Sequence, residues 1–243
     1  MTRLDYRDLD RCVRRLPPAL VKTIQERESL MVAGGFIRTV ITNERPSDID
    51  VFATDDKGAK TAAGNYRQRC GPADRQPKQV DTDNAITVLT RPPVQFIHRW
   101  TFDGPDKLIQ SFDFSIARAV IWWSGARWES MIDDRFYVDL AARRLVFMAP
   151  SSNTSGGTLL RLQKFIARGY RASAANIAAI AAQLARDAMR EKTIVGAGIE
   201  DEVARQMIRL VREVDPSSAD WDEETDPARE PVPPPPVDDG ENF

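Results

Sequence analysis

The 243-residue sequence has one histidine, two cysteines and no long apolar segment. A structural zinc site needs four protein ligands, so His98, Cys12 and Cys70 are too few to form one. Two cysteines also cannot build the disulfide framework of a small secreted domain. The apolar runs are shorter than the roughly 20 residues of a membrane span, and the first residues lack the apolar core of a secretory signal. These absences indicate a reduced, cytoplasmic chain without membrane contact, whose chemistry depends on carboxylates, hydroxyls, lysine or arginine.

The net charge of −2 is unevenly distributed along the sequence. Residues 215–243 contain ten acidic residues and one basic residue, which leaves the rest of the chain with a net charge of +7. Seven of the sixteen prolines follow Val214. A segment this acidic and rich in proline buries too little apolar surface to offset its ordering entropy. We therefore predict a disordered tail over residues 216–243, and a moderately basic body that favours nucleotides or nucleic acids as partners.

Hydrophobic periodicity divides the remaining residues into two parts. Up to residue 150, helical and strand patterns alternate, which predicts an α/β (α+β) domain with a mixed sheet flanked by helices. The strands are expected at 29–33, 48–52, 85–89, 94–100 and 112–122, and the helices at 9–16, 18–28, 36–41 and within 57–84. Residues 139–148 fit either a helix or a strand. A Ser- and Gly-rich linker starts at residue 151, and helices at 159–169, 172–188 and 199–213 predict a small helical domain over 151–215.

The most specific motif in the sequence is Gly34-Gly35, followed after twelve residues by Asp48-Ile49-Asp50. On one strand, Asp48 and Asp50 point to the same face, about 6–7 Å apart. Two such carboxylates repel each other unless a divalent cation lies between them, and Mg²⁺ suits oxygen ligands that leave room for phosphates. A Gly-Gly turn that opens a helix lets backbone approach an anion closely. We therefore expect a nucleoside triphosphate with its phosphates at the glycines and its metal ions at the aspartates.

Asp113 is the candidate third carboxylate, because it is the acidic residue in the apolar segment 111–117. An acidic side chain there needs a partner. That partner is either a metal ion or an arginine, with Arg38 and Arg118 as the candidates for a salt bridge. Ser47, just before the aspartates, either binds a phosphate or caps the strand, and the sequence does not choose between the two.

The segments 33–38 and 47–52 together resemble the signature of the DNA polymerase β-type nucleotidyltransferase superfamily. The match is nearest to the head domain of class II CCA-adding enzymes and bacterial poly(A) polymerases. Segment 113–117 resembles that family's second motif, and 160–170 resembles the helix that follows the head. Two arginines of the second motif are replaced here by Ser111-Phe112.

The resemblance implies roles for the residues that match. Gly34 and Gly35 would hold the triphosphate, and Asp48 and Asp50 would bind two Mg²⁺ ions. Asp113 would be a further metal ligand or a contact to the nucleotide sugar. The remaining basic residues of the motifs would face phosphates; they are Arg38, Arg161, Lys164 and Arg168.

The expected activity is therefore transfer of a nucleoside monophosphate from a nucleoside triphosphate to an acceptor hydroxyl, with release of pyrophosphate. An RNA 3′ end, as in a tRNA, is the favoured acceptor. A protein or small-molecule hydroxyl is the alternative acceptor. The Ser111-Phe112 replacement also leaves open a binding module that has the fold but no turnover.

Overall fold

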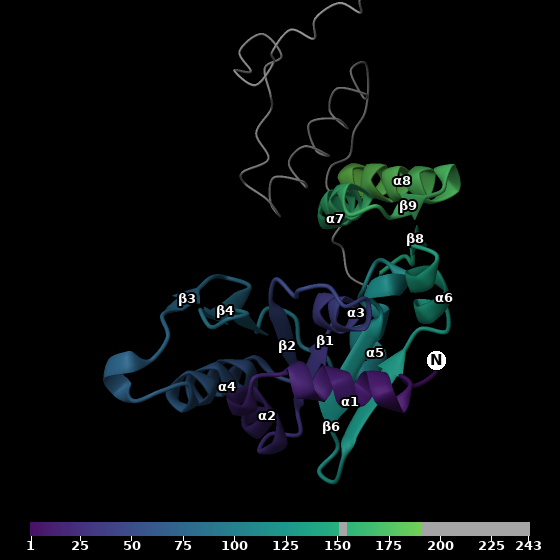
Figure 1. Ribbon diagram of the computed structural model, residues 1–243. Helices are drawn as coiled ribbons and strands as arrows, with labels where there is room; N and C mark the ends of the chain where they lie inside the picture. The colour runs from purple at the N-terminus through teal and green to yellow at the C-terminus, as the bar shows by residue number, and fades with distance from the viewer. Residues whose placement is uncertain (151–154, 191–243) are drawn as a thin grey trace, which may run out of the picture.

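The computed structural model describes residues 1–150 and 155–190. It has a central mixed sheet with helices on both sides, and two further helices packed together at one end (Figure 1). The α/β architecture expected from the sequence is confirmed. The helix expected at 199–213 and the tail expected at 216–243 lie outside the described residues. None of the described helices is long and apolar enough to cross a lipid bilayer.

Seven strands form the sheet in the order β3-β4-β5-β2-β1-β6-β7. Only the β2–β5 pairing is parallel among the pairings of this sheet. The strands are β1 (Leu30–Ala33), β2 (Ile49–Ala53), β3 (Gln79–Asp81), β4 (Ala85–Val88), β5 (Val94–Ile97), β6 (Ala119–Trp123) and β7 (Trp128–Ile132). Strand β2 therefore lies in the middle of the sheet, between β5 and β1.

One face of the sheet carries the main core beneath four helices. These are α1 (Tyr6–Arg15), α2 (Pro18–Gln25), α3 (Gly35–Ile41) and α4 (Asp56–Arg69). Val32, Val51 and Ile121 point to this face and are fully buried. The opposite face carries a smaller cluster that includes Met31 and Ala33, covered by α5 (Pro105–Gln110). In β2, the alternation of side chains along a strand turns Asp50 toward this second face.

The chain beyond β7 forms short elements and then two longer helices. They are α6 (Phe136–Ala141), β8 (Arg144–Leu145), α7 (Ser155–Ala167), β9 (Arg171–Ala172) and α8 (Ala174–Arg190). Phe165 of α7 is buried in the main core cluster, and its ring lies 5.6 Å from that of Phe114. Helix α7 is thereby attached to the sheet-bearing part through an aromatic contact.

The expected strand over 112–122 is wrong in its first half. Residues 115–117 form a short 3₁₀-helix, η2 (Ser115–Ala117), and only Ala119–Trp123 belongs to the sheet. The backbone of Ser115 donates to Val146, and Met148 donates to Asp113, so these residues pair with a later segment. Asp113 is therefore not a residue of the central sheet. The sequence patterns also do not reveal strands β3 and β7, because β3 has only three residues and both strands contain polar residues.

Candidate active site

The turn between β1 and α3 is built around Gly34, as the sequence predicts. Its φ is 78°, a conformation that residues with a side chain rarely adopt. A Cβ atom at this position would also lie 3.2 Å from the ring of Phe112. The Gly34 N–H donates to the carbonyl of Ala119 at 3.1 Å, so that N–H is already used inside the sheet. Gly34 therefore allows close approach of another group and does not itself supply a free donor.

The two aspartates lie beside this turn. Asp50 pairs in register with Ala33 at the end of β1, and a Cβ atom on Gly34 would be 4.0 Å from Asp50 Oδ2. Asp48 precedes the first residue of β2 by one position, and Ser47 Oγ donates a hydrogen bond of 2.9 Å to its Oδ1. Ser47 thus holds the Asp48 carboxylate.

Asp50 is held in an environment that disfavours its charge. Burial raises its pKa to about 7, and the nearby charge of Asp48 adds to the shift. Repulsion between two carboxylates is relieved when a divalent cation binds between them. The side chains of Asp48 and Asp50 therefore fit a Mg²⁺ ion that takes its remaining ligands from water and phosphate oxygens.

Asp113 pairs with an arginine, but with neither of the two that the sequence analysis considered. Its Oδ2 accepts a hydrogen bond of 2.6 Å from Arg161 Nε, and the residue is 3% exposed. The salt bridge considered with Arg38 or Arg118 is thus made by Arg161 of α7. Within residues 1–150 and 155–190, no three carboxylate, His or Cys side chains gather closely enough to hold a metal ion. The expected cage of three aspartates is not formed among these residues.

Arg38 is the most unusual charged residue near the turn. It is 3% exposed, and its Nε has no hydrogen-bond partner among the described residues. Its guanidinium lies 4.7 Å from the centre of the Phe165 ring, and burial lowers its pKa. The guanidinium lies beside Gly35, where a Cβ atom would be 3.9 Å from Arg38 Nη2, an ordinary van der Waals contact. A buried guanidinium with an unpaired N–H is well suited to bind an anion.

The other three basic residues lie on or just after α7. The side chain of Arg161 is 42% exposed and is paired with Asp113, whereas Lys164 and Arg168 are exposed. Arg168 is close enough to Arg38 for its charge to lower the pKa of that guanidinium, in addition to the larger effect of burial. The structure therefore brings Arg168 toward the site, while Arg161 is occupied by a carboxylate.

Sequence reasoning missed two residues of this region. Phe112 packs against the Gly34 turn, and Gln95 of β5 pairs in register with Asp50. Parallel neighbours in register present their side chains on the same face, so Gln95 lies beside Asp50. The β2–β5 pairing is a long-range contact that periodicity along one segment cannot reveal.

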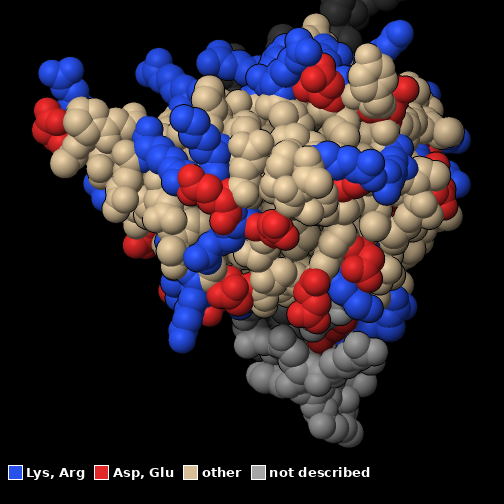
Figure 2. All heavy atoms as spheres, turned by 90° about the horizontal axis from the view of Figure 1, so that it is seen from below, with Lys and Arg blue, Asp and Glu red and all other residues tan. Residues whose placement is uncertain are grey.

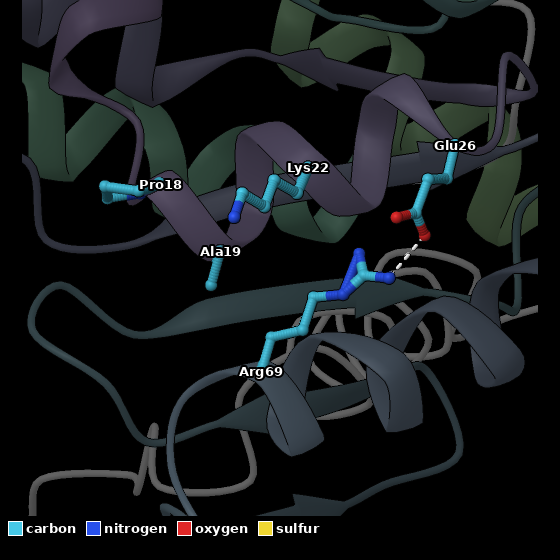
Figure 3. Close-up of a pocket in the computed structure, with 5 residues that line it drawn as sticks. All are labelled: Pro18, Ala19, Lys22, Glu26 and Arg69. Atoms are coloured by element: carbon cyan, nitrogen blue, oxygen red, sulfur yellow. Dashed lines mark hydrogen bonds and ion pairs between the residues drawn. The ribbon is translucent and has the colours of Figure 1, made fainter.

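A separate hollow of about 480 Å³ lies between α2 and α4 (Figure 3). It is lined by Pro18, Ala19, Lys22, Glu26 and Arg69. Of the two basic residues that line the hollow, Lys22 and Arg69, the second forms an ion pair with Glu26. This hollow has neither the aspartates nor the glycine turn, and the candidate active site is the region of Gly34, Arg38, Asp48 and Asp50.

Comparison with known proteins gives a family and a fold. A family model described as Gad2, a Gabija anti-defense 2 family protein, matches residues 8–143. No curated protein sequence matches the chain. Among solved structures, a CCA-adding enzyme of Thermotoga maritima in complex with tRNA is similar with a TM-score of 0.51 and 16% identity, over 91% of this chain and 58% of that one.

Two further solved structures give the same fold. A CCA-adding enzyme in complex with ATP has a TM-score of 0.52 at 17% identity, over 91% of this chain and 59% of that one. A tRNA-processing enzyme in an apo form has a TM-score of 0.51 at 14% identity, over 86% of this chain and 62% of that one. The chain spans less than two thirds of the length of each. The nucleotidyltransferase fold expected from the sequence is thereby confirmed.

Proposed function

More than half of the chain matches that family model, so the chain belongs to the Gabija anti-defense 2 family, and we propose that it is a Mg²⁺-dependent nucleotidyltransferase. Its substrate is a nucleoside triphosphate, and its products are pyrophosphate and an acceptor carrying a nucleoside monophosphate. Because the family is described as an anti-defense family, we propose that this reaction acts against the Gabija defence.

The proposal rests on one observation, the position of two carboxylates beside the Gly34 turn. Asp50 Oδ2 lies next to this turn. Burial raises the pKa of Asp50, and Asp48 is close enough for its charge to raise that pKa further. Strands β1 and β2 fix this arrangement, because Ala33 and Asp50 are register partners and Gly34 follows Ala33 directly. A carboxylate pair beside a turn without side chains leaves space for a metal-bound triphosphate. The nucleotidyltransferase fold supports the same interpretation.

Asp48 and Asp50 would hold Mg²⁺, which when bound polarises the α-phosphate and stabilises the charge of the leaving pyrophosphate. Ser47 orients the Asp48 carboxylate through its hydrogen bond. Asp50 would hold the ion as an ionised carboxylate, because a nearby cation favours the charged form. In the transfer step, the acceptor oxygen forms a bond to the α-phosphorus, the bond to the bridging oxygen breaks, and the hydroxyl proton passes to solvent.

Arg38 would bind the triphosphate. Its guanidinium is buried behind Gly35 and against Phe165, and Nε has no partner among the described residues. A phosphate oxygen would satisfy that N–H and neutralise the buried charge. Lys164 and Arg168, both exposed on or after α7, are candidates for the outer phosphates, and Arg161 would need to leave Asp113 to join them.

The acceptor that we favour is an RNA 3′ end. The body of the chain is basic, and the fold is that of solved proteins described as CCA-adding and tRNA-processing enzymes. A protein or small-molecule hydroxyl is the alternative acceptor.

A second candidate function is nucleotide binding without turnover. The pairing of Asp113 with Arg161 supports it, because that ion pair removes the third carboxylate from the metal site. In this case Asp48 and Asp50 would bind a metal-bound nucleotide that is not consumed.

The test uses the full chain with each of the four α-labelled ribonucleoside triphosphates, Mg²⁺ and total RNA. Pyrophosphate release and label transfer to one acceptor pool are expected with at least one nucleotide. Asp48→Asn and Asp50→Asn should abolish both signals, whereas Asp83→Asn, an exposed carboxylate in the β3–β4 turn, should not. Mg²⁺-dependent nucleotide binding without pyrophosphate would favour the second candidate. Full activity in Asp48→Asn and Asp50→Asn would remove the proposal.

A further inference from the structure

Four arginines gather where the end of α6 meets the end of α7. Arg143 and Arg144 follow α6, and Arg168 and Arg171 follow α7. All four are exposed, and we call them the arginine ridge. Strands β8 and β9 join the two segments, and the backbone N–H of Arg171 donates to the carbonyl of Arg143 at 2.9 Å. The ridge is therefore a feature of the tertiary structure, since its two halves are 24 or more residues apart in sequence.

The two strands place like charges directly beside each other. Arg144 and Arg171 are register partners in the parallel β8–β9 pair. Side chains at such positions lie on the same face, and like charges there are destabilising. Arg144 has a partial counter-charge in Asp139 at 3.4 Å, but Asp139 is fully buried and also pairs with Arg135. Asp139 therefore offsets only part of the positive charge at these two register partners.

The backbone at Arg143 is held in an unfavourable conformation. Arg143 has a φ of 48°. This left-handed region is costly for a residue with a long side chain. The other described positions with positive φ are filled by glycine or by Asn43, which tolerate it. The Arg143 guanidinium donates to the Arg168 carbonyl at 3.1 Å and lies 5.9 Å from the centre of the Tyr170 ring. Arg143 thus connects the two halves of the ridge through its hydrogen bond to Arg168, although its own backbone is strained.

Tyr170 connects the ridge with the candidate active site. It is 3% exposed, and its ring lies 5.6 Å from that of Phe165, over which the Arg38 guanidinium is stacked. Burial raises the pKa of Tyr170 and the charge of Glu44 adds to that rise, whereas the charges of Arg38, Arg143 and Arg168 oppose it. The packed rings of Tyr170 and Phe165 therefore link Arg143 of the ridge to Arg38 of the candidate active site.

The cations of the ridge are all of one residue type. The face seen from below mixes acidic and basic side chains (Figure 2). At the ridge, by contrast, all four cations are arginines. The planar guanidinium binds phosphate through two parallel hydrogen bonds, which lysine does not offer.

From these observations we propose that the arginine ridge, through Arg143, Arg144 and Arg171, binds the phosphate backbone of a single-stranded nucleic acid whose end lies at Asp48 and Asp50, while Arg168 faces the nucleotide. This inference rests on the proposed function for the position of that end. The binding itself requires only the ridge, because phosphate contacts position a nucleic acid without reading its sequence.

The experiment measures binding of a fluorescein-labelled single-stranded RNA of mixed sequence to the full chain over a range of KCl concentrations. Arg144→Ala with Arg171→Ala removes two phosphate contacts. For a single strand, each contact contributes about 0.7 to the slope of log K against log salt concentration, so the slope should fall in magnitude by about 1.4. Arg7→Ala with Arg15→Ala, two exposed arginines of α1, removes the same charge and should leave the slope unchanged.

Arg171→Ala alone is the second variant, because no described partner of its side chain would be lost. In this variant the magnitude of the slope of log K against log salt concentration should fall by about 0.7. An equal loss of binding in the α1 pair would show that only net charge matters and would overturn the proposal. Equally effective competition by polyglutamate would assign the ridge to an acidic protein instead. If RNA binding depends on the ridge but no nucleotide is transferred, the proposed function is wrong and the proposal that the ridge binds nucleic acid still stands.

Discussion

Arg161 Nε lies 2.6 Å from Oδ2 of Asp113 and joins α7 to the segment that precedes η2. Asp113 is buried, whereas the Arg161 side chain is 42% exposed, so the ion pair lies at the boundary between core and solvent. The sequence predicts a metal-binding role for residue 113 and a phosphate-binding role for residue 161. The structure instead uses each to satisfy the other.

Removing the arginine should therefore cost stability. In Arg161→Ala the Asp113 carboxylate stays buried without its partner, and the free energy of unfolding should fall by on the order of 2 kcal/mol. Urea unfolding followed by circular dichroism measures this. Unchanged stability would mean that the ion pair contributes nothing.

Asp113 has two possible roles, as the partner of Arg161 or as a metal ligand, and a substitution distinguishes them. If Asp113 serves only Arg161, Asp113→Asn should leave the Mg²⁺ dependence of nucleotide binding unchanged, as measured by titration with Mg²⁺. A loss of Mg²⁺ dependence as large as that of Asp50→Asn would give Asp113 the metal-ligand role that its sequence context suggested.

Arg38 and Arg118 should respond in opposite ways to the same substitution. Arg38→Met removes a buried charge whose Nε lacks a described partner. The free energy of unfolding should therefore rise, by on the order of 1 kcal/mol. Arg118→Met should lower it, because Arg118 donates to the carbonyls of Phe112, Gln110 and Met148 and pairs with Asp133. Urea unfolding of both variants measures the two changes, and a loss of stability in Arg38→Met would contradict the first.

Arg38→Met should also weaken phosphate binding. Pyrophosphate with Mg²⁺ should raise the melting temperature of the unmodified chain and raise that of Arg38→Met less. Differential scanning fluorimetry gives both values. An equal rise in the two proteins would exclude Arg38 from the phosphate site.

Asp50 should make stability depend on pH. Its pKa is about 7 in the folded chain and near the usual value of 3.8 when unfolded. Between these values the folded state holds more protons than the unfolded state, so stability falls as pH rises from about 4 to about 7. Asp50→Asn should match the unmodified chain near pH 4 and exceed its stability above pH 7, by on the order of 1 kcal/mol for each pKa unit.

The measurement is urea unfolding at several pH values in the presence of EDTA, which removes divalent cations. Asp83→Asn, which removes an exposed carboxylate of the β3–β4 turn, is the matched control. A profile for Asp50→Asn that parallels the unmodified chain throughout would contradict the assigned environment of Asp50.

Two glycines should give opposite results when replaced by alanine. Gly34→Ala places a Cβ against the Phe112 ring at a positive φ. This change should lower the free energy of unfolding by roughly 1–3 kcal/mol. Gly64→Ala lies within α4, where the new Cβ meets open space. It should raise the free energy of unfolding by roughly 0.4–1 kcal/mol. Thermal unfolding of both variants tests the pair, and a neutral Gly34→Ala would show that the turn is not strained by a side chain.

The sequence alone determined the local parts of the candidate site. Gly34-Gly35 opens α3, and Asp50 lies in a strand of alternating burial, because turn chemistry and period-two alternation are properties of neighbouring residues. The mixed α/β class followed from the same local signals. The resemblance to the nucleotidyltransferase superfamily rested on these motifs, and its fold is the one observed.

Only the tertiary structure decided which distant residues meet. Asp113 has the pattern of a strand residue because aromatic and apolar residues surround it, yet pairing with residues 146–148 and with Arg161 removes it from the sheet. Likewise Gln95 reaches Asp50, and Arg144 reaches Arg171, through strand pairings between separate segments. The physical reason is that a charged side chain is satisfied by whichever partner the packing of other elements brings within hydrogen-bond distance, and this packing is not encoded in the spacing of nearby residues.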